Sequence, residues 1–201
     1  MPTIDQSTLD IVISICLGLG LSAACGFRVF VPLLGLSLAA MGGYVQPATG
    51  WEWVGSWPAL ACLATATVLE IAAYYIPWLD NALDSIATPA AVIAGTLATA
   101  SVVTDLPPLW RWSLAAIAGG GIAGLIQAAT VTLRGASTVT TGGLANFLVS
   151  TGELILSLIT TLLAIVLPLI AAVLAVGIVV WGVVRLTSRK RTEPLSVKQA
   201  S

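Results

Sequence analysis

The chain has 201 residues, of which 58% are hydrophobic and 8% are charged, and its formal net charge is −1. Its mean hydropathy is +1.01, whereas charged residues make up about 25% of a typical soluble domain. These values exclude a soluble globular domain, because too few charged side chains exist to cover its surface. They predict an all-α polytopic membrane protein with about six transmembrane helices, within a range of about five to seven.

The residue inventory also limits the chemistry of the protein. Histidine is absent, and both lysines, Lys190 and Lys198, follow the last apolar segment. This excludes a catalytic unit based on Ser-His or Cys-His, a histidine metal site and a lysine base inside the membrane. We therefore expect no enzyme, no metal site and no cofactor.

Basic residues are concentrated at the C-terminal end of the chain. Five of the eight lie there, namely Arg185, Arg189, Lys190, Arg191 and Lys198. The positive-inside rule then predicts a cytoplasmic C-terminus. The cluster is too short and too mixed for a nucleic-acid patch, so the expected partner is the lipid bilayer and no nucleic acid.

The first half of the chain predicts a hydrocarbon-length helix over 11–27, which ends at Arg28. The next apolar run, 29–43, is shorter than the roughly 20 residues that a spanning helix needs, and Pro32 lies near its start. This run favours a re-entrant or steeply broken helix, with a complete crossing by a short helix as the alternative. A loop with three tryptophans follows over 44–57 and is typical of the headgroup zone.

Two further spans are predicted over 58–76 and 88–103, and a tryptophan-containing turn separates them. After the interfacial loop 104–112, another span covers 113–133.

The last long apolar run covers 153–184 and contains Pro168. At about 1.5 Å per residue it would extend roughly 48 Å, which exceeds the roughly 30 Å of a hydrocarbon core. It is either one tilted, kinked helix or two short helices that meet near residues 160–168.

The two halves of the chain resemble each other. GLSAACGFR (20–28) aligns with GLIQAATVTLR (124–134), and the segment 69–95 aligns with 152–177. The alignment pairs residues of the same type, namely Arg28 with Arg134, Glu70 with Glu153, and Pro89 with Pro168. We therefore predict a first membrane repeat over 1–104, a second over 105–186, and a basic cytoplasmic tail over 187–201.

If each repeat crosses the membrane three times, the two repeats must be inverted, as they are in many transporters. That arrangement gives about six crossings, cytoplasmic termini, and short broken or re-entrant helices after Arg28 and after Arg134. No basic residue near the N-terminus supports this orientation. An outside N-terminus with an odd number of crossings is the alternative.

The paired charges Arg28, Arg134, Glu70 and Glu153 are the first candidate site residues. An ionised side chain near the centre of a membrane helix costs about 2.5–3.5 kcal/mol. Four such groups without partners would cost on the order of 10 kcal/mol, which rivals the stability of a whole domain. Either they form Arg–Glu pairs around a pathway, or the arginines snorkel to the headgroups while the glutamates hold helices together.

The polar stretch 135–152 supplies the second set of candidates. Its hydroxyl and amide side chains could replace part of the hydration shell of a solute, and the helix that follows would favour an anion at its N-terminus. The alternative is a solvated loop that caps this helix. The residues are Ser137, Thr138, Thr140, Thr141 and Asn146.

Three segments carry a family resemblance: GLSAACGFRVFVPLL, EIAAYYIPWLDNALDSIATPAAVIAG and RGASTVTTGGLANFLVSTGE. Over residues 11–175 the chain resembles a bacterial family of small integral membrane proteins known as domain of unknown function 4126. The resemblance implies a multi-pass protein of the bacterial inner membrane and implies no activity, substrate or catalytic residue. Many members of that family carry an Asp-Lys pair where this chain has Ala73 and Tyr74, so a role of that pair is not expected here.

We predict from these features a small transporter or channel for a small polar or anionic solute, acting as a homo-oligomer. Arg28 and Arg134 would attract the solute, Glu70 and Glu153 would balance their charge, and the segment 137–146 would line the path. The alternative is a non-conducting membrane protein that acts in assembly, lipid handling or scaffolding.

Overall fold

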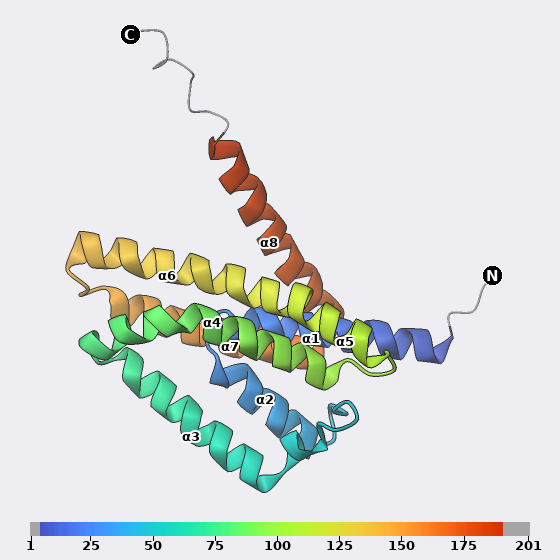
Figure 1. Cartoon of the computed structure of the whole chain (residues 1–201). Coiled ribbons are helices and arrows are strands. Elements are labelled where there is room, and N and C mark those ends of the chain that lie inside the picture. The colour runs from blue at the N-terminus through green and yellow to red at the C-terminus, as the bar shows by residue number, and fades with distance from the viewer. Residues whose placement is uncertain (1–4, 191–201) are drawn as a thin grey trace, which may run out of the picture.

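The computed structural model describes residues 5–190, and every regular element within this range is a helix. Six helices are long and apolar enough to cross a membrane. They form an elongated bundle in which most helices run roughly side by side, while the last helix leaves the bundle at an angle (Figure 1). The predicted all-helical membrane fold with about six spans is therefore confirmed.

Helix α1 (Gln6–Cys25) lies at the centre of the bundle and contacts α4, α6, α7 and α8. Small residues on α1 allow this close packing. A Cβ atom on Gly20 would come within 2.8 Å of Ala164 on α7 and within 2.9 Å of Ala171 on α8. Hydroxyl groups add polar contacts, since Ser22 Oγ donates to the carbonyl oxygen of Gly95 on α4 at 2.7 Å. Both devices are typical of helix contacts in membranes.

Helix α2 (Phe30–Met41) is the short element that was expected after Arg28. Its 12 residues extend about 18 Å, which is too short for a roughly 30 Å hydrocarbon core. Pro32 explains the break before α2, because a proline fits the first turn of a new helix but disrupts a continuous one. At the break, a Cβ atom on Gly26 would come within 2.6 Å of Ile126, so glycine lets α6 approach the turn.

Helices α3 (Trp57–Tyr74) and α4 (Pro77–Val102) follow a loop that contains the short 3-10 helix η1 (Glu52–Gly55). Trp51 in this loop packs against Trp53 and Trp112, with ring centroids 6.0 and 6.4 Å apart. The predicted aromatic loop is therefore a cluster of indole rings at one end of the bundle. The division predicted at residue 104 falls in the connection between α4 and α5.

One long rod begins the second half. Helix α5 (Pro108–Leu114) continues through the π-helical segment η2 (Ala115–Gly120) into α6 (Gly121–Thr141). The predicted break after Arg134 was wrong, because α6 continues to Thr141 and ends at Gly142, which has a φ of 64°. Hydroxyl groups explain the continuity. Those of Thr140 and Thr141 donate to carbonyl oxygens one turn earlier, so these polar side chains are satisfied within the helix.

The final apolar run forms two helices, α7 (Asn146–Val166) and α8 (Pro168–Lys190). Leu167 separates them with φ −135° and ψ 65°, and Pro168 begins the second helix because it cannot continue the first. Residues 187–190 of the predicted tail continue α8, and residues 191–201 lie outside the described part of the chain.

Candidate functional site

The structure gathers the predicted charged residues where the α1–α2 turn meets α3, α6 and α7. Three of them are almost completely enclosed, with exposed fractions of 2% for Arg28, 1% for Arg134 and 3% for Glu153. The arginines therefore do not snorkel to the headgroups. Groups as polar as these are stable inside a protein only when they are paired or hydrogen-bonded.

Arg134 and Glu153 form the central pair of the cluster. Nε of Arg134 donates to Oε1 of Glu153 at 3.0 Å, and Nη2 donates to Oε2. This two-pronged geometry matches the planar guanidinium to the carboxylate. Nη2 of Arg28 lies 3.8 Å from Oε2 of the same carboxylate. Glu153 is therefore hydrogen-bonded to Arg134 and forms a longer ion pair with Arg28.

Glu70 has a different role. Its side chain reaches from α3 to the start of α2, where Oε1 accepts from the backbone N–H of Val29 at 2.7 Å and Oε2 accepts from that of Phe30 at 3.1 Å. No side chain of α2 caps this end. A carboxylate stabilises a helix N-terminus because it satisfies free N–H groups and opposes the positive end of the helix dipole.

Tyr74 completes the cluster and was missed as a site residue. The guanidinium carbons of Arg28 and Arg134 lie 3.8 and 4.2 Å from the centroid of its buried ring. Both contacts are within cation–π range. Tyr74 follows Glu70 by four residues, so the two share a face of α3. This spacing was the available signal in the sequence.

The candidates with hydroxyl or amide side chains lie partly at the junction of α6 and α7 and partly on the exposed surface of α6. Nδ2 of Asn146 donates to Oγ1 of Thr138 at 3.0 Å and ties the start of α7 to the end of α6. Thr140 and Thr141 are exposed, and their hydroxyls bond within α6. Ser137 Oγ is buried with no hydrogen-bond partner among the described residues. The structure therefore does not bring this segment as a whole into the charged cluster.

A stripe of buried polar residues on α7 was not recognised in the sequence. It comprises Asn146, Ser150, Glu153, Ser157 and Thr161. Their spacing of three or four residues places them on one helix face. The other faces of α7 carry exposed leucine and isoleucine side chains. The helix thus turns its polar face toward the protein and its apolar face outward, which is the reverse of a helix in a soluble protein.

Helix α6 contributes polar groups to the same interior, since Gln127, Thr130 and Arg134 are all buried. Several polar atoms of the two helices have no hydrogen-bond partner among the described residues, including Nε2 of Gln127, Oγ of Ser150 and Oγ1 of Thr161. Buried polar atoms without partners are uncommon. They are available here to water or to a polar solute.

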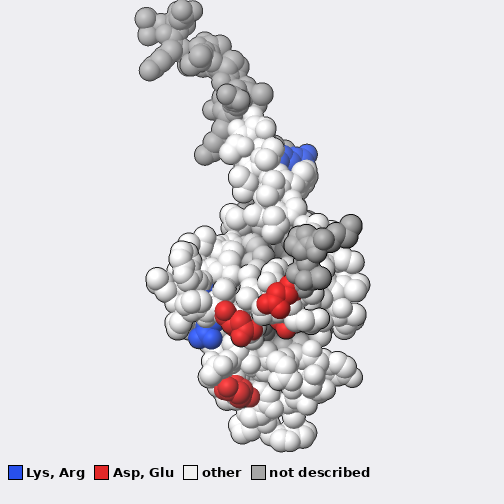
Figure 2. All heavy atoms as spheres, turned by 90° about the vertical axis from the view of Figure 1, so that its right-hand side faces the viewer, with Lys and Arg blue, Asp and Glu red and all other residues white. Residues whose placement is uncertain are grey.

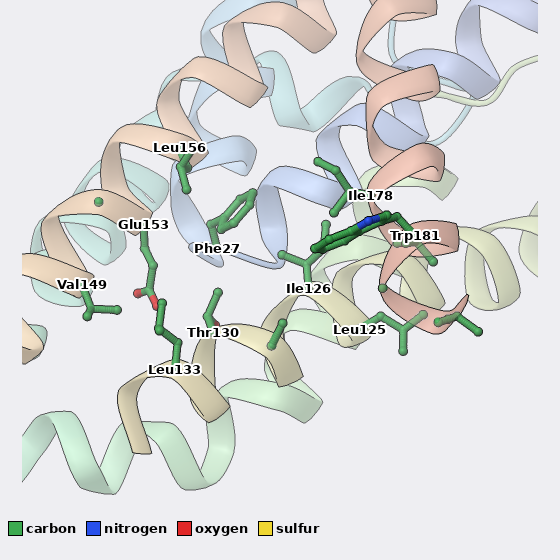
Figure 3. Close-up of a pocket in the computed structure, with 15 residues that line it drawn as sticks. Phe27, Leu125, Ile126, Thr130, Leu133, Val149, Glu153, Leu156, Ile178 and Trp181 are labelled. Atoms are coloured by element: carbon green, nitrogen blue, oxygen red, sulfur yellow. The ribbon is translucent and has the colours of Figure 1, made fainter. Parts of the chain in front are cut away.

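Two hollows approach this interior. A groove of about 420 Å³ lies between α6, α7 and α8 and has an almost wholly apolar lining, in which Glu153 points from α7 toward α6 (Figure 3). A larger vestibule of about 950 Å³ lies at the loop end of the bundle, and its lining includes Asp10, Asp105 and Arg111. Figure 2 views this end and shows acidic side chains gathered over it.

The cluster lacks the composition of a metal centre, because no group of three His, Cys, Asp or Glu residues able to hold a metal ion occurs within residues 5–190. Its chemistry is that of ion pairing and hydrogen bonding between arginine, carboxylate, phenol and hydroxyl groups. Such a site can bind a charged or polar solute, or it can hold helices together.

Comparison with known proteins gives a family but no activity. No curated protein and no solved structure matches this chain. A family model described as "Domain of unknown function (DUF4126)" matches residues 15–189. This range includes every residue of the charged cluster and all of the polar stripe on α7. The chain therefore belongs to the family described as domain of unknown function DUF4126.

Proposed function

We propose that this protein is a small membrane transporter for a polar or anionic solute. The polar stripe on α7, which meets two buried arginines at its middle, is the observation that carries the proposal. The low total charge of the chain opposes a wide aqueous pore. A narrow path lined by hydroxyl and amide groups agrees better with this composition.

The stripe is long enough to serve as a path. From Asn146 to Thr161 the helix rises about 22 Å, which is most of a roughly 30 Å hydrocarbon core. One turn beyond Thr161 lies Ile165, which lines the vestibule. A solute that enters from the vestibule would therefore meet Thr161 and Ser157 before it reaches the arginines.

The charged cluster would act as the closed point of this path. Glu153 lies within the stripe and is bound by Arg134 through two hydrogen bonds, so passage requires this pair to separate. An anion could assist by taking the place of one carboxylate beside an arginine. With the pair formed, the proposed path is closed near its middle and open at the vestibule end.

A second candidate function is lipid handling, and the apolar groove favours it. The groove lies between α6, α7 and α8, and Glu153 belongs to its lining. A lipid chain that entered from the bilayer would therefore reach the charged cluster from the side. In this case the protein would move or present an amphiphile and would not conduct a soluble ion.

The positions of the helix ends support an orientation in the membrane. Asp10 near the start of α1 and Pro168 at the start of α8 line the same vestibule. Tyr44, which follows α2, also lines it, so α1 and α2 together return the chain to the side from which it entered. If the five remaining long helices then cross the bilayer, the N-terminus and the basic tail lie on opposite sides. The positive-inside rule then places the tail in the cytoplasm and the vestibule outside. We infer an outside N-terminus and a cytoplasmic C-terminus, in the inner membrane of a bacterium.

Swelling of proteoliposomes tests transport directly. Vesicles would be placed in isosmotic glycerol, or in potassium chloride or nitrate with valinomycin, and light scattering would report entry of the solute. We expect faster swelling than in protein-free vesicles for at least one of these probes. The variants Arg134→Gln and Glu153→Gln should change that rate at least about tenfold, because each removes one partner of the pair that closes the path and leaves the other uncompensated.

Glu52→Gln is the matched control, because this carboxylate is exposed on η1 and should leave the rate unchanged. Equal swelling in the wild-type protein and in both cluster variants would reject the transport proposal. Movement of a fluorescent phospholipid between leaflets, without swelling and dependent on Glu153, would support the lipid-handling function instead.

A further inference from the structure

Arg28 has unused hydrogen-bonding capacity. Its Nη2 donates to the carbonyl oxygen of Ser150 at 2.7 Å, but Nε and Nη1 are buried and have no hydrogen-bond partner among the described residues. Glu153 does not fill these two hydrogen-bonding positions, because it already accepts two hydrogen bonds from Arg134 and its Oε2 lies 3.8 Å from Nη2 of Arg28. A buried guanidinium in this state favours an additional acceptor.

The N-terminus of α2 directly follows Arg28. Its first backbone N–H groups, those of Val29 and Phe30, converge on the two oxygens of Glu70. Converging N–H groups at a helix N-terminus form a binding site for any small anion, and not only for a carboxylate. Glu70 therefore shows where an anion is accepted.

Arg28 and this helix end face the same part of α3. The guanidinium lies over Tyr74, which is one helical turn from Glu70 on the same face of α3. The buried cation and the N–H groups that Glu70 accepts from therefore lie beside the same face of α3. They belong to consecutive residues, so the break between α1 and α2 positions both.

We infer that Arg28 and the N-terminus of α2 form a binding site for a small monovalent anion, which the Glu70 carboxylate occupies as an internal competitor. This inference deepens the proposed function, because it names the class of solute, and it rests on that proposal for its role in transport. Glu70 is only half-buried, so its side chain has room to leave the site, whereas Glu153 is enclosed.

The charge of the cluster selects a monovalent ion. Arg28 and Arg134 are balanced by Glu70 and Glu153, so the cluster is neutral when all four groups are ionised. Once the charge of Glu70 is removed, one external monovalent anion restores neutrality, whereas a divalent anion leaves an excess negative charge in a region of low dielectric constant. Chloride and nitrate are suitable probes, and sulfate is the matched divalent probe.

The test compares nitrate binding to the wild-type protein and to Glu70→Gln, which removes the competing charge and keeps the side-chain size. Thermal unfolding of the purified full-length protein in detergent would be followed while nitrate replaces gluconate at constant ionic strength. A ligand that binds the folded state raises the Tm in a saturable manner. We expect Glu70→Gln to bind nitrate at least about tenfold more tightly than the wild type, and sulfate to have no saturable effect.

The double variant R28Q/E70Q should lose the nitrate response, whereas R111Q/E70Q, which changes an arginine of the vestibule, should keep it. If R28Q/E70Q does not fold, R28K/E70Q retains the positive charge with fewer donors and should bind nitrate with intermediate affinity. An identical nitrate response in the wild type and in Glu70→Gln would overturn the inference. So would a full response without Arg28.

The two proposals can fail separately. Loss of the nitrate response, combined with swelling that still depends on Arg134 and Glu153, would reject the anion site and leave transport standing. Saturable nitrate binding without swelling would support the anion site and reject transport.

Discussion

Removal of one partner from the Arg134–Glu153 pair should destabilise the protein far more than removal of both. The pair is joined by two hydrogen bonds, and both side chains are at most 3% exposed. Glu153→Gln leaves two arginines against one carboxylate in the cluster, and Arg134→Met leaves two carboxylates against one arginine. An uncompensated buried charge costs about 3–5 kcal/mol, so each single variant should lose that amount.

The double variant R134M/E153L removes one positive and one negative charge, so the cluster stays neutral through Arg28 and Glu70. Replacement of a buried ion pair by apolar residues of similar volume is often neutral or stabilising. We therefore expect the double variant to lose less than about 2 kcal/mol, although the single losses sum to about 6–10 kcal/mol.

Unfolding by denaturant in mixed detergent micelles would measure the four free energies of unfolding. Glu52→Gln serves as the surface control and should stay within about 0.5 kcal/mol of the wild type. Additive losses in the double variant would refute the reasoning, because additivity would mean that the two charges do not compensate each other.

Three further predictions concern other parts of the molecule. Tyr74→Leu should lower the free energy of unfolding by about 1–2 kcal/mol relative to Tyr74→Phe, because leucine cannot form cation–π contacts and phenylalanine can; thermal unfolding of the two variants measures the difference. Gly26→Val should destabilise the fold and Gly135→Val should not, because a Cβ atom meets Ile126 at the first position and open space at the second; the yield of monodisperse protein checks this. Tyr44→Cys and Ser188→Cys, each made in a protein without the native cysteines, test the inferred orientation with a membrane-impermeant thiol reagent. We expect Tyr44→Cys to react from outside and Ser188→Cys to react from the cytoplasmic side. Reaction of both variants from the same side would contradict the orientation.

The sequence predicted the membrane fold well because long apolar runs determine where helices can span a bilayer. It also predicted the break before α2, where Pro32 and a short apolar run both disfavour a continuous helix. The break after Arg134 was predicted wrongly. The hydroxyl groups of Thr140 and Thr141 bond within their own helix, and composition alone does not distinguish this arrangement from a polar loop.

Part of the charged cluster could be predicted from the sequence. Buried charges in an apolar chain are conspicuous, so Arg28, Arg134 and Glu153 were recognised. The role of Glu70 was not, because it depends on backbone N–H groups about 40 residues away in the chain. The choice of Glu153 as the partner of Arg134 depends on how α6 and α7 face each other, which sequence spacing does not determine. The polar stripe of α7, by contrast, follows helical periodicity and could have been found.

The angle at which α8 leaves the bundle (Figure 1) would make the protein responsive to bilayer thickness. The first half of α8 is anchored, since Ala171, Ala172 and Ala175 are buried, while Val180, Val183 and Val184 in its second half face outward. The apolar span of α8, Pro168–Arg185, has 18 residues and is about 27 Å long, which is close to a hydrocarbon core of about 30 Å. A membrane thinner than this span would tilt α8 around Leu167 and move Trp181 relative to α6. Because Trp181 lines the groove beside Glu153, lipid chain length would set how widely the groove opens.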